Sequence, residues 1–244
     1  MDLQKYGQAR QTVLNRTQVQ NGIGTLGEKT LHAVLKEYYK TNALAQEYKI
    51  GRYVADLAGE NQIIEIQTRQ FYKMTKKLLF FLQDYDVTII YPVPHHRWVC
   101  WMDAEGNLSK KRKSPKVGAP YDILSELAGI KPLLFHPRLH FCIVLLDTED
   151  CRLLNGWSLD KKRGSTRYER IPLTLIEEVE LHKKEDFHRL LPPNLPTSFT
   201  SADFSHIAKR PLRFAQQALN VLYEAGAVIR TGREGRAYQY QIPR

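Results

Sequence analysis

The chain has 244 residues, a net charge of +10 and a sequence pI near 9.4. This length allows one large or two modest domains, and a hydrophobic fraction of 43% is enough for a packed core and too low for a membrane protein. The apolar runs are too short to span a bilayer, and the N-terminus lacks the apolar segment of a signal peptide. Three scattered cysteines indicate neither a disulfide framework nor a cysteine zinc site, and a reducing cytoplasm is the expected compartment. The positive charge favours a polyanionic partner, or it simply maintains solubility.

The N-terminal part of the chain predicts one helix after an undecided segment. Residues 1–22 are polar and basic, and they fit either a helix or a loose arm. From Thr25 onward, apolar residues recur at helical spacing, at Leu31, Val34, Leu35 and Tyr38. Glu28 stands three residues after Thr25, so it either closes a capping box or serves a functional site. His32, one turn later, is expected to be a surface or packing residue.

Acidic residues mark the next segment, which predicts a hairpin. Tyr48–Ile50 and Arg52–Asp56 fit one bent strand or two short ones, and Ile63–Gln67 fits another strand after a turn at 58–61. Glu65 and Gln67 are expected on one face of that strand. The facing strand would bring Asp56 near them. Two neighbouring carboxylates repel unless a cation lies between them, and oxygen ligands suit Mg²⁺. The alternative is that these acids lie in a turn and on a solvated edge.

A helix and a buried strand follow. Phe71–Gln83 predicts a helix whose lysines, Lys73, Lys76 and Lys77, either hold phosphate or form an ordinary solvated face. Asp86–Tyr91 predicts a buried strand that Pro92 and Pro94 end.

These residues resemble the PD-(D/E)xK nuclease superfamily over about residues 24–94. Asp56 matches the first acidic position of the motif and Glu65 the second, whereas Gln67 stands where Lys is usual. Glu28 matches the acidic residue that many members carry on the preceding helix, and the order helix, hairpin, helix, strand matches the family core. The resemblance implies Mg²⁺- or Mn²⁺-dependent hydrolysis of a phosphodiester. It assigns the metal to Asp56 and Glu65, the orientation of water to Gln67, and assistance to Glu28.

The middle of the chain predicts a sheet with basic connections. His95–Arg97 is expected in a loop, followed by a hairpin whose turn covers residues 103–107 and by a basic run at 109–116. Tyr121–Leu127 predicts a short helix and Leu139–Asp147 a strand, with Cys151–Leu154 as its returning partner. A second basic cluster covers residues 160–167. Each basic stretch is either a solvated loop or an arm that binds the nucleic-acid backbone.

The C-terminal part resembles a winged-helix domain. Lys184–Leu190 would be its first helix, Thr200 or Ser201 caps the second, and Lys209-Arg210 forms the turn before a third helix that Pro211 begins and Gly226 ends. Strands at 227–230 and 237–242 would form a hairpin with a basic tip. In such domains the helix after the turn commonly enters the major groove, and the alternative use is protein contact or dimerisation.

The sequence therefore predicts an α/β protein in two parts: a restriction-endonuclease-like domain at 1–180 with a central mixed β-sheet flanked by helices, and a winged-helix DNA-binding domain at 181–244. The predicted function is a metal-dependent DNA endonuclease, which could act as a homodimer. The alternative is a nuclease-like DNA-binding regulator without catalysis, favoured by the absence of Lys at position 67. The predicted DNA-binding residues are Lys110, Lys111, Arg112, Lys113, Lys116, Lys161, Lys162, Arg163, Arg167, Lys209, Arg210, Arg213, Gln216, Gln217, Arg233 and Arg236.

Overall fold

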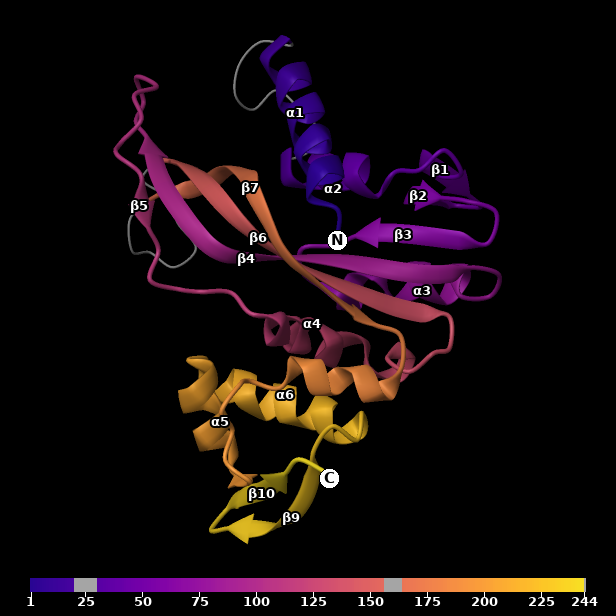
Figure 1. The fold of residues 1–244 in the computed structure, drawn as a ribbon, viewed down its shortest axis with the longest axis vertical. Helices are drawn as coiled ribbons and strands as arrows, with labels where there is room; N and C mark the ends of the chain where they lie inside the picture. The colour runs from indigo at the N-terminus through magenta and orange to yellow at the C-terminus, as the bar shows by residue number, and fades with distance from the viewer. Residues whose placement is uncertain (20–29, 156–163, 244) are drawn as a thin grey trace. The chain divides into compact units, whose positions relative to one another are not determined.

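The computed structural model describes residues 1–19, 30–155 and 164–243 (Figure 1). Its α-helices are α1 (Leu3–Val19), α2 (Thr30–Tyr39), α3 (Thr75–Phe81), α4 (Leu124–Leu127), α5 (Ser201–Ala208) and α6 (Leu212–Glu224). Its 3₁₀ helices are η1 (Phe71–Met74), η2 (Pro120–Ile123), η3 (Ala128–Leu133) and η4 (Lys184–Leu190). Its strands are β1 (Ala45–Ile50), β2 (Tyr53–Ala58), β3 (Gln62–Ile66), β4 (Asp86–Met102), β5 (Arg112–Lys113), β6 (Leu139–Leu153), β7 (Thr166–Leu181), β8 (Ser198–Phe199), β9 (Ile229–Glu234) and β10 (Ala237–Gln241).

A mixed β-sheet is the centre of the fold. Its seven strands follow the hydrogen-bonded order β1-β2-β3-β4-β6-β7, and β5 pairs with β4. β1 and β2 are antiparallel, whereas β3 and β4 are parallel, with Glu65 opposite Ile89. A second sheet has the order β8-β10-β9. The predicted α/β class with a large mixed sheet and flanking helices is therefore confirmed.

The chain divides into two compact units, each assembled from separate segments. The first contains Met1–Glu60, Pro92–Ala119 and Val144–Glu178. The second contains Asn61–Tyr91, Pro120–Ile143 and Val179–Arg244. Three long strands, β4, β6 and β7, contribute to both units, because each is longer than the usual strand of about 5–6 residues.

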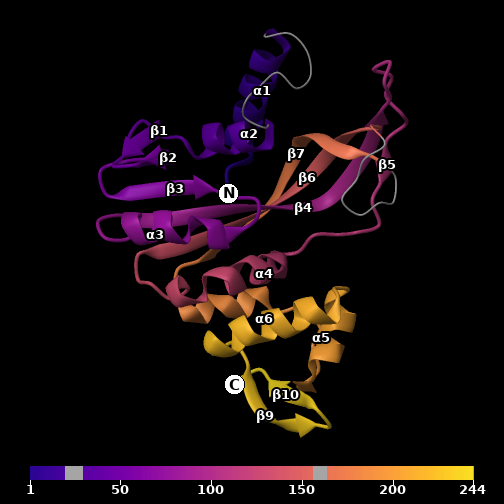
Figure 2. The same ribbon diagram turned by 180° about the vertical axis from the view of Figure 1, so that it is seen from behind.

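In the first unit, α1 packs against α2, as Figures 1 and 2 both show. Tyr6 and Val13 of α1 are buried, and the Tyr6 ring meets the Tyr38 ring edge-on at 5.6 Å. The apolar residues that predict α2 are all buried, which confirms the helical spacing. Residues 3–19 of the N-terminal segment are thus a helix rather than a loose arm.

In the second unit, α5 and α6 lie beside the β9–β10 hairpin (Figures 1 and 2). Thr200 caps α5 by accepting hydrogen bonds from the backbone of Ala202 and Asp203, as expected of an N-cap threonine. Gly226 follows α6 with a φ of 74°, a left-handed conformation that suits glycine after a helix end. Pro211 is the residue before α6 rather than its first residue.

Pro92 and Pro94 do not end their strand, which corrects the sequence prediction. β4 continues through both prolines to Met102, and His95–Arg97 lie within it rather than in a loop. The prolines share the strand side of Ile90, whose carbonyl accepts the final hydrogen bond from Gln67 N at 2.9 Å. β3 has ended beyond that point, so no β3 carbonyl lies opposite the two proline nitrogens. The lack of an N–H group at Pro92 and Pro94 therefore costs no hydrogen bond between β3 and β4.

Smaller differences affect three other predicted segments. Cys151–Leu154 is not a returning strand: residues 151–153 extend β6, and the partner beside β6 is β7, which the sequence did not predict. The predicted helix at 71–83 is split into η1 and α3. β9 reaches Glu234, so Arg233 lies in a strand, and the turn contains Gly235 and Arg236.

Candidate functional site

Glu65 is a buried acid with a cationic partner. It lies on β3 with 3% of its surface exposed, and its Oε2 atom is 2.6 Å from Nζ of Lys77. The lysine side chain is 22% exposed and its ammonium also lies 5.5 Å from the centroid of the Phe81 ring. Burying a carboxylate without a charge partner costs free energy, and the ion pair with Lys77 offsets this cost for Glu65.

Local packing explains why Lys77 reaches Glu65. Leu78 and Phe81 of α3 are fully buried, as is Phe71 of η1, and these side chains fix the rotation of the helical segment. Lys76, by contrast, is exposed. The sequence had grouped Lys77 with its neighbours as phosphate holders or a solvated face, because no local spacing reveals a contact with a residue twelve positions earlier.

Asp56 has a histidine partner that the sequence prediction set aside. On β2 of the first unit, Oδ2 of Asp56 lies 3.2 Å from Nε2 of His32, which α2 carries. Both side chains are partly exposed, at 21% and 25%. His32 is therefore a contact of the predicted catalytic acid rather than an ordinary surface or packing residue. A histidine in this position can restrain the carboxylate and, when protonated, favour its charged form.

Gln67 follows the last residue of β3, and its side chain is engaged locally. Its Nε2 atom donates a hydrogen bond to the carbonyl oxygen of Arg69 at 2.6 Å, and its backbone N–H bonds to Ile90. The amide oxygen is the remaining polar atom of this side chain and is chemically an acceptor for water. Glu28, the other predicted participant, lies outside the described residues.

The donor chemistry of the predicted acids suits a hard cation, since both Asp56 and Glu65 offer carboxylate oxygens. Within residues 1–19, 30–155 and 164–243, no group of three or more histidine, cysteine, aspartate or glutamate side chains is arranged to hold a metal ion. The third acid implied by the family resemblance, Glu28, is not among those residues. The predicted metal ligands therefore amount to two described carboxylates.

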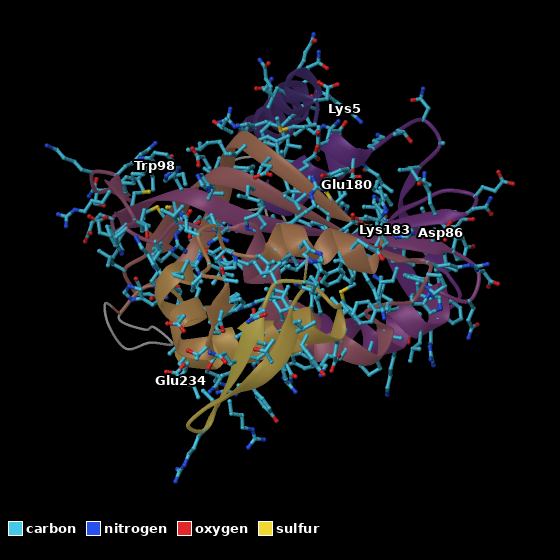
Figure 3. All side chains as sticks on the ribbon, turned by 60° about the horizontal axis from the view of Figure 1, so that its bottom comes forward. Lys5, Asp86, Trp98, Glu180, Lys183 and Glu234 are labelled. Atoms are coloured by element: carbon cyan, nitrogen blue, oxygen red, sulfur yellow. The ribbon has the colours of Figure 1, made fainter. Side chains whose placement is uncertain are left out.

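The basic run at 109–116 contains a short strand instead of only a loop. Arg112 and Lys113 form β5, which pairs with Val99 and Trp98 of β4. Lys113 lies 5.6 Å from the centroid of the Trp98 ring, and Figure 3 labels this tryptophan. Lys111 pairs with Glu149 at 2.6 Å. Lys110 and Lys116 are exposed, as a backbone-binding role requires.

The other predicted DNA-binding residues differ in their surroundings. Residues 161–163 lie outside the described part of the chain, while Arg167 is the second residue of β7. Arg213, Gln216 and Gln217 are exposed on α6, and Lys209, Arg233 and Arg236 are also exposed. Arg210 instead makes two hydrogen bonds to Asp122, at 2.6 and 2.8 Å. Its charge is therefore already balanced within the protein.

An arginine cluster in the first unit was missed entirely. Arg170 binds both carboxylate oxygens of Asp150 at 2.6 and 2.7 Å, and Arg97 lies 3.9 Å from the same carboxylate. Asp150 is buried, and burial lowers the pKa of the Arg97 guanidinium despite this acid. The three side chains come from β7, β6 and β4, so only the folded sheet brings them together.

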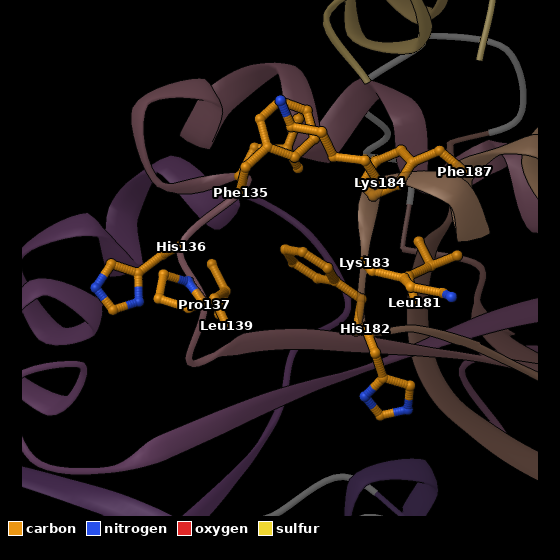
Figure 4. A pocket seen from close by; sticks show the side chains of 11 residues that line it. Phe135, His136, Pro137, Leu139, Leu181, His182, Lys183, Lys184 and Phe187 are labelled. Carbon is orange, nitrogen blue, oxygen red and sulfur yellow. The ribbon is translucent and has the colours of Figure 1, made fainter. Parts of the chain in front are cut away.

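A cavity of about 220 Å³ lies in the second unit, away from the predicted residues (Figure 4). Its lining includes Phe135, Phe141 and Phe187, and Lys184 extends over the Phe135 ring at 4.5 Å from the centroid. None of the predicted catalytic or DNA-binding residues is among those that line it. It is an apolar cavity with a basic edge.

The described part of the chain contains no helix of the length and apolar character needed to cross a membrane.

Comparison with known proteins gives a family but no activity. A protein of Treponema pallidum (strain Nichols) with the description "Uncharacterized protein" is 27% identical over 166 residues, which are 68% of this chain and 64% of the relative. The match thus spans slightly less than two thirds of that relative's length. No solved structure matches the chain. Residues 29–182, more than half of the 244, match the model of a family described as "Domain of unknown function (DUF8091)", and the chain belongs to that family.

Proposed function

We propose that the protein is a metal-dependent DNA endonuclease of the PD-(D/E)xK type, with Asp56 and Glu65 as its metal-binding carboxylates. The observation that carries this proposal is the ion pair between the buried Glu65 and Lys77. A buried carboxylate with a lysine beside it is often less stabilising than apolar side chains would be in the same place. Such a pair inside a sheet is therefore a candidate for a functional role. The pair also supplies the acid and the cation of the family motif, although the lysine comes from a helix.

The arrangement of elements gives further support. Helix α2, the consecutive strands β2 and β3, helix α3 and strand β4 follow one another in the order of the family core. The parallel pairing of β3 with β4 is compatible with α3 as the crossover between them. Asp56 lies on β2 and Glu65 on β3, and Gly59, Glu60 and Asn61 connect these two strands.

Each residue then has a distinct role. Asp56, restrained by His32, and Glu65 would hold Mg²⁺ or Mn²⁺. Such an ion polarises a phosphate and lowers the pKa of bound water when it is present. Lys77 supplies the positive charge that Gln67 lacks, and it offsets negative charge that develops on the phosphate. Gln67 accepts a hydrogen bond from water through its amide oxygen and so orients it.

The test is cleavage of labelled duplex, branched and single-stranded DNA with Mg²⁺, Mn²⁺ or a chelator. Asp56→Ala and Glu65→Gln should abolish cleavage, whereas Glu60→Gln is a matched control, because Glu60 is an exposed acid between the same two strands. Cleavage that survives in Asp56→Ala would reject the proposed site.

A DNA-binding regulator without catalysis is the second candidate. It is favoured by the exposed polar face of α6, where Arg213, Gln216 and Gln217 face solvent beside a basic β9–β10 hairpin. The sheet order β8-β10-β9 and the positions of α5 and α6 fit a winged helix, in which the helix after the turn, here α6, commonly enters the major groove. DNA binding without cleavage in any metal would favour this function over the endonuclease.

A further inference from the structure

A second cavity, of about 350 Å³, opens on the first unit beside the β4–β5 pair. Trp101, Ser109, Lys110, Arg112 and Leu154 line it. Trp101 is partly exposed, and 46% of the Leu154 surface is exposed. The cavity therefore combines an aromatic ring and an aliphatic side chain with two cationic groups and a hydroxyl.

The strand register explains why these groups meet. Arg112 pairs with Val99, so their side chains share one face of the ladder, and Trp101 is two residues from Val99 on the same face. Trp98 pairs with Lys113 and lies on the opposite face. Backbone contacts also hold Ser109 to Trp101, since Ser109 N donates to Trp101 O at 2.8 Å and Ser109 Oγ accepts from Trp101 N at 3.0 Å.

The two positive charges at this cavity come from Lys110 and Arg112. Within the described residues, no ion pair joins Lys110 or Arg112 to a carboxylate, whereas the neighbouring Lys111 pairs with Glu149 at 2.6 Å. The same short segment thus has two charges available to an anion and one already neutralised. A ligand that suits this surface has a flat, stackable part next to negative charge.

We propose that this cavity takes an unpaired nucleobase of single-stranded DNA, which stacks on Trp101 against Leu154 while Lys110 and Arg112 bind the flanking phosphates. The proposal rests on the nucleic-acid partner of the proposed function and narrows it to DNA with a single-stranded region. A base inside a duplex is stacked on both sides and has no free face for Trp101. An aromatic platform beside cationic groups is the usual way in which proteins hold single strands.

The experiment measures the fluorescence anisotropy of labelled DNA with the full chain in chelator, so that no cleavage occurs. The probes are a thymidine oligonucleotide, the same length of duplex, and an abasic oligonucleotide that keeps the phosphates. Trp101→Ala should weaken binding of the thymidine strand roughly 10-fold or more, given the usual contribution of one stacked base. Trp101→Ala should leave the affinity for the abasic strand unchanged. Trp101→Phe should keep most of the affinity for the thymidine strand, because phenylalanine still offers an aromatic ring.

Matched controls come from the same hairpin. Trp98→Ala should leave the difference between the thymidine and abasic strands intact, because Trp98 lies on the other face. Lys110→Ala and Arg112→Ala should weaken binding of both strands, and Lys111→Ala should do so much less. Equal effects of Trp101→Ala on thymidine and abasic strands, or a wild-type protein that prefers duplex, would overturn the proposal.

This binding test is independent of catalysis. Asp56→Ala should retain the preference for the thymidine strand even though it abolishes cleavage. Cleavage without any dependence on Trp101 would overturn the base-binding cavity and leave the endonuclease standing. A Trp101-dependent preference without cleavage in any metal would do the reverse.

Discussion

Nζ of Lys77 lies 2.6 Å from Oε2 of Glu65, although helix α3 carries the lysine and strand β3 the acid. This contact places a positive charge at Glu65 where the neighbouring Gln67 provides none. Lys77→Met should therefore destabilise the fold by about 2 kcal/mol, below the ~3–5 kcal/mol of a fully buried pair because Lys77 is partly exposed. The midpoint of urea unfolding measures this loss.

Lys76→Met is the matched control, since Lys76 is exposed on the same helix and should change stability by less than about 0.5 kcal/mol. The double variant Glu65→Gln/Lys77→Met should recover part of the loss, because no buried charge is then left without a partner. Equal losses in Lys76→Met and Lys77→Met would show that the ion pair contributes nothing.

The arginine cluster makes a second prediction. Asp150→Asn removes the carboxylate that Arg170 binds through two hydrogen bonds, and Arg97 then faces other arginines without its acid. We expect a loss of about 3–5 kcal/mol in the free energy of unfolding, as for other buried pairs that lose one partner. Glu105→Gln, at an exposed turn, is the control for loss of a negative charge. An unchanged melting temperature in Asp150→Asn would contradict this account.

The helices and the mixed sheet were largely predictable because their signals are local. The spacing of Leu31, Val34 and Leu35 defines α2, and Ala215, Ala218 and Leu219 likewise define the buried side of α6. The predicted strand at 86–91 was shorter than β4, because the sequence does not show where β3 ends. Proline is unfavourable in a strand only where its N–H would be needed for a hydrogen bond to the neighbouring strand. β7 was missed because its buried residues do not alternate regularly along the strand.

The candidate site was less predictable than the fold. Asp56 and Glu65 were predicted as site residues from the acids and the turn between them, but their contacts with His32 and Lys77 were not predicted. His32 and Lys77 come from helices whose rotation is fixed by the packing of other residues. Asp150 and Arg170 likewise lie on different strands, twenty residues apart in the sequence. Such contacts leave no periodic pattern in the sequence.

Close approach of two segments makes Gly118 intolerant of a side chain. A Cβ atom there would lie 2.7 Å from Cγ1 of Val93 and 2.9 Å from the carbonyl carbon of Pro94, with the Pro94 oxygen closer still. The backbone hydrogen bond from Gly118 N to His95 O, at 2.9 Å, would have to shift. Gly118→Ala should therefore destabilise the protein by at least about 1–3 kcal/mol.

Gly7→Ala is the opposite case and serves as its control. Gly7 lies inside α1 with nothing within 4 Å of the added atom, so alanine should stabilise the helix by about 0.5–1 kcal/mol. Thermal unfolding of both variants should thus give shifts of opposite sign. A shift of the same sign for both would refute the steric explanation for Gly118.

Burial of the thiols should make the free energy of unfolding fall as the pH becomes alkaline. Burial raises the pKa of Cys100 from 9.0 to about 12, with a further contribution from Cys151, whose own pKa burial also raises. Between pH 9 and 12 the unfolded chain loses the Cys100 proton while the folded chain keeps it, so the free energy of unfolding should fall. Cys100→Ala should reduce this slope in urea titrations at several pH values.

The same burial predicts slow chemistry at the thiols. Cys100, Cys142 and Cys151 are buried thiols, so a thiol reagent at pH 8 should label the folded protein far more slowly than the urea-unfolded chain. Fast labelling of the native protein would mean that these side chains are accessible. In that case the alkaline loss of stability should also be absent.

The final prediction separates the charges on and beside α6. Arg213 is exposed on this helix, whereas Arg210 is neutralised by Asp122. If α6 contacts DNA, Arg213→Gln should lower affinity and reduce the slope of log K against log salt by about 1, because one fewer counterion is released. Arg210→Gln should leave that slope unchanged and instead destabilise the fold, since Asp122 loses its two hydrogen bonds. Equal slopes for the wild type and Arg213→Gln would remove Arg213 from the DNA contact.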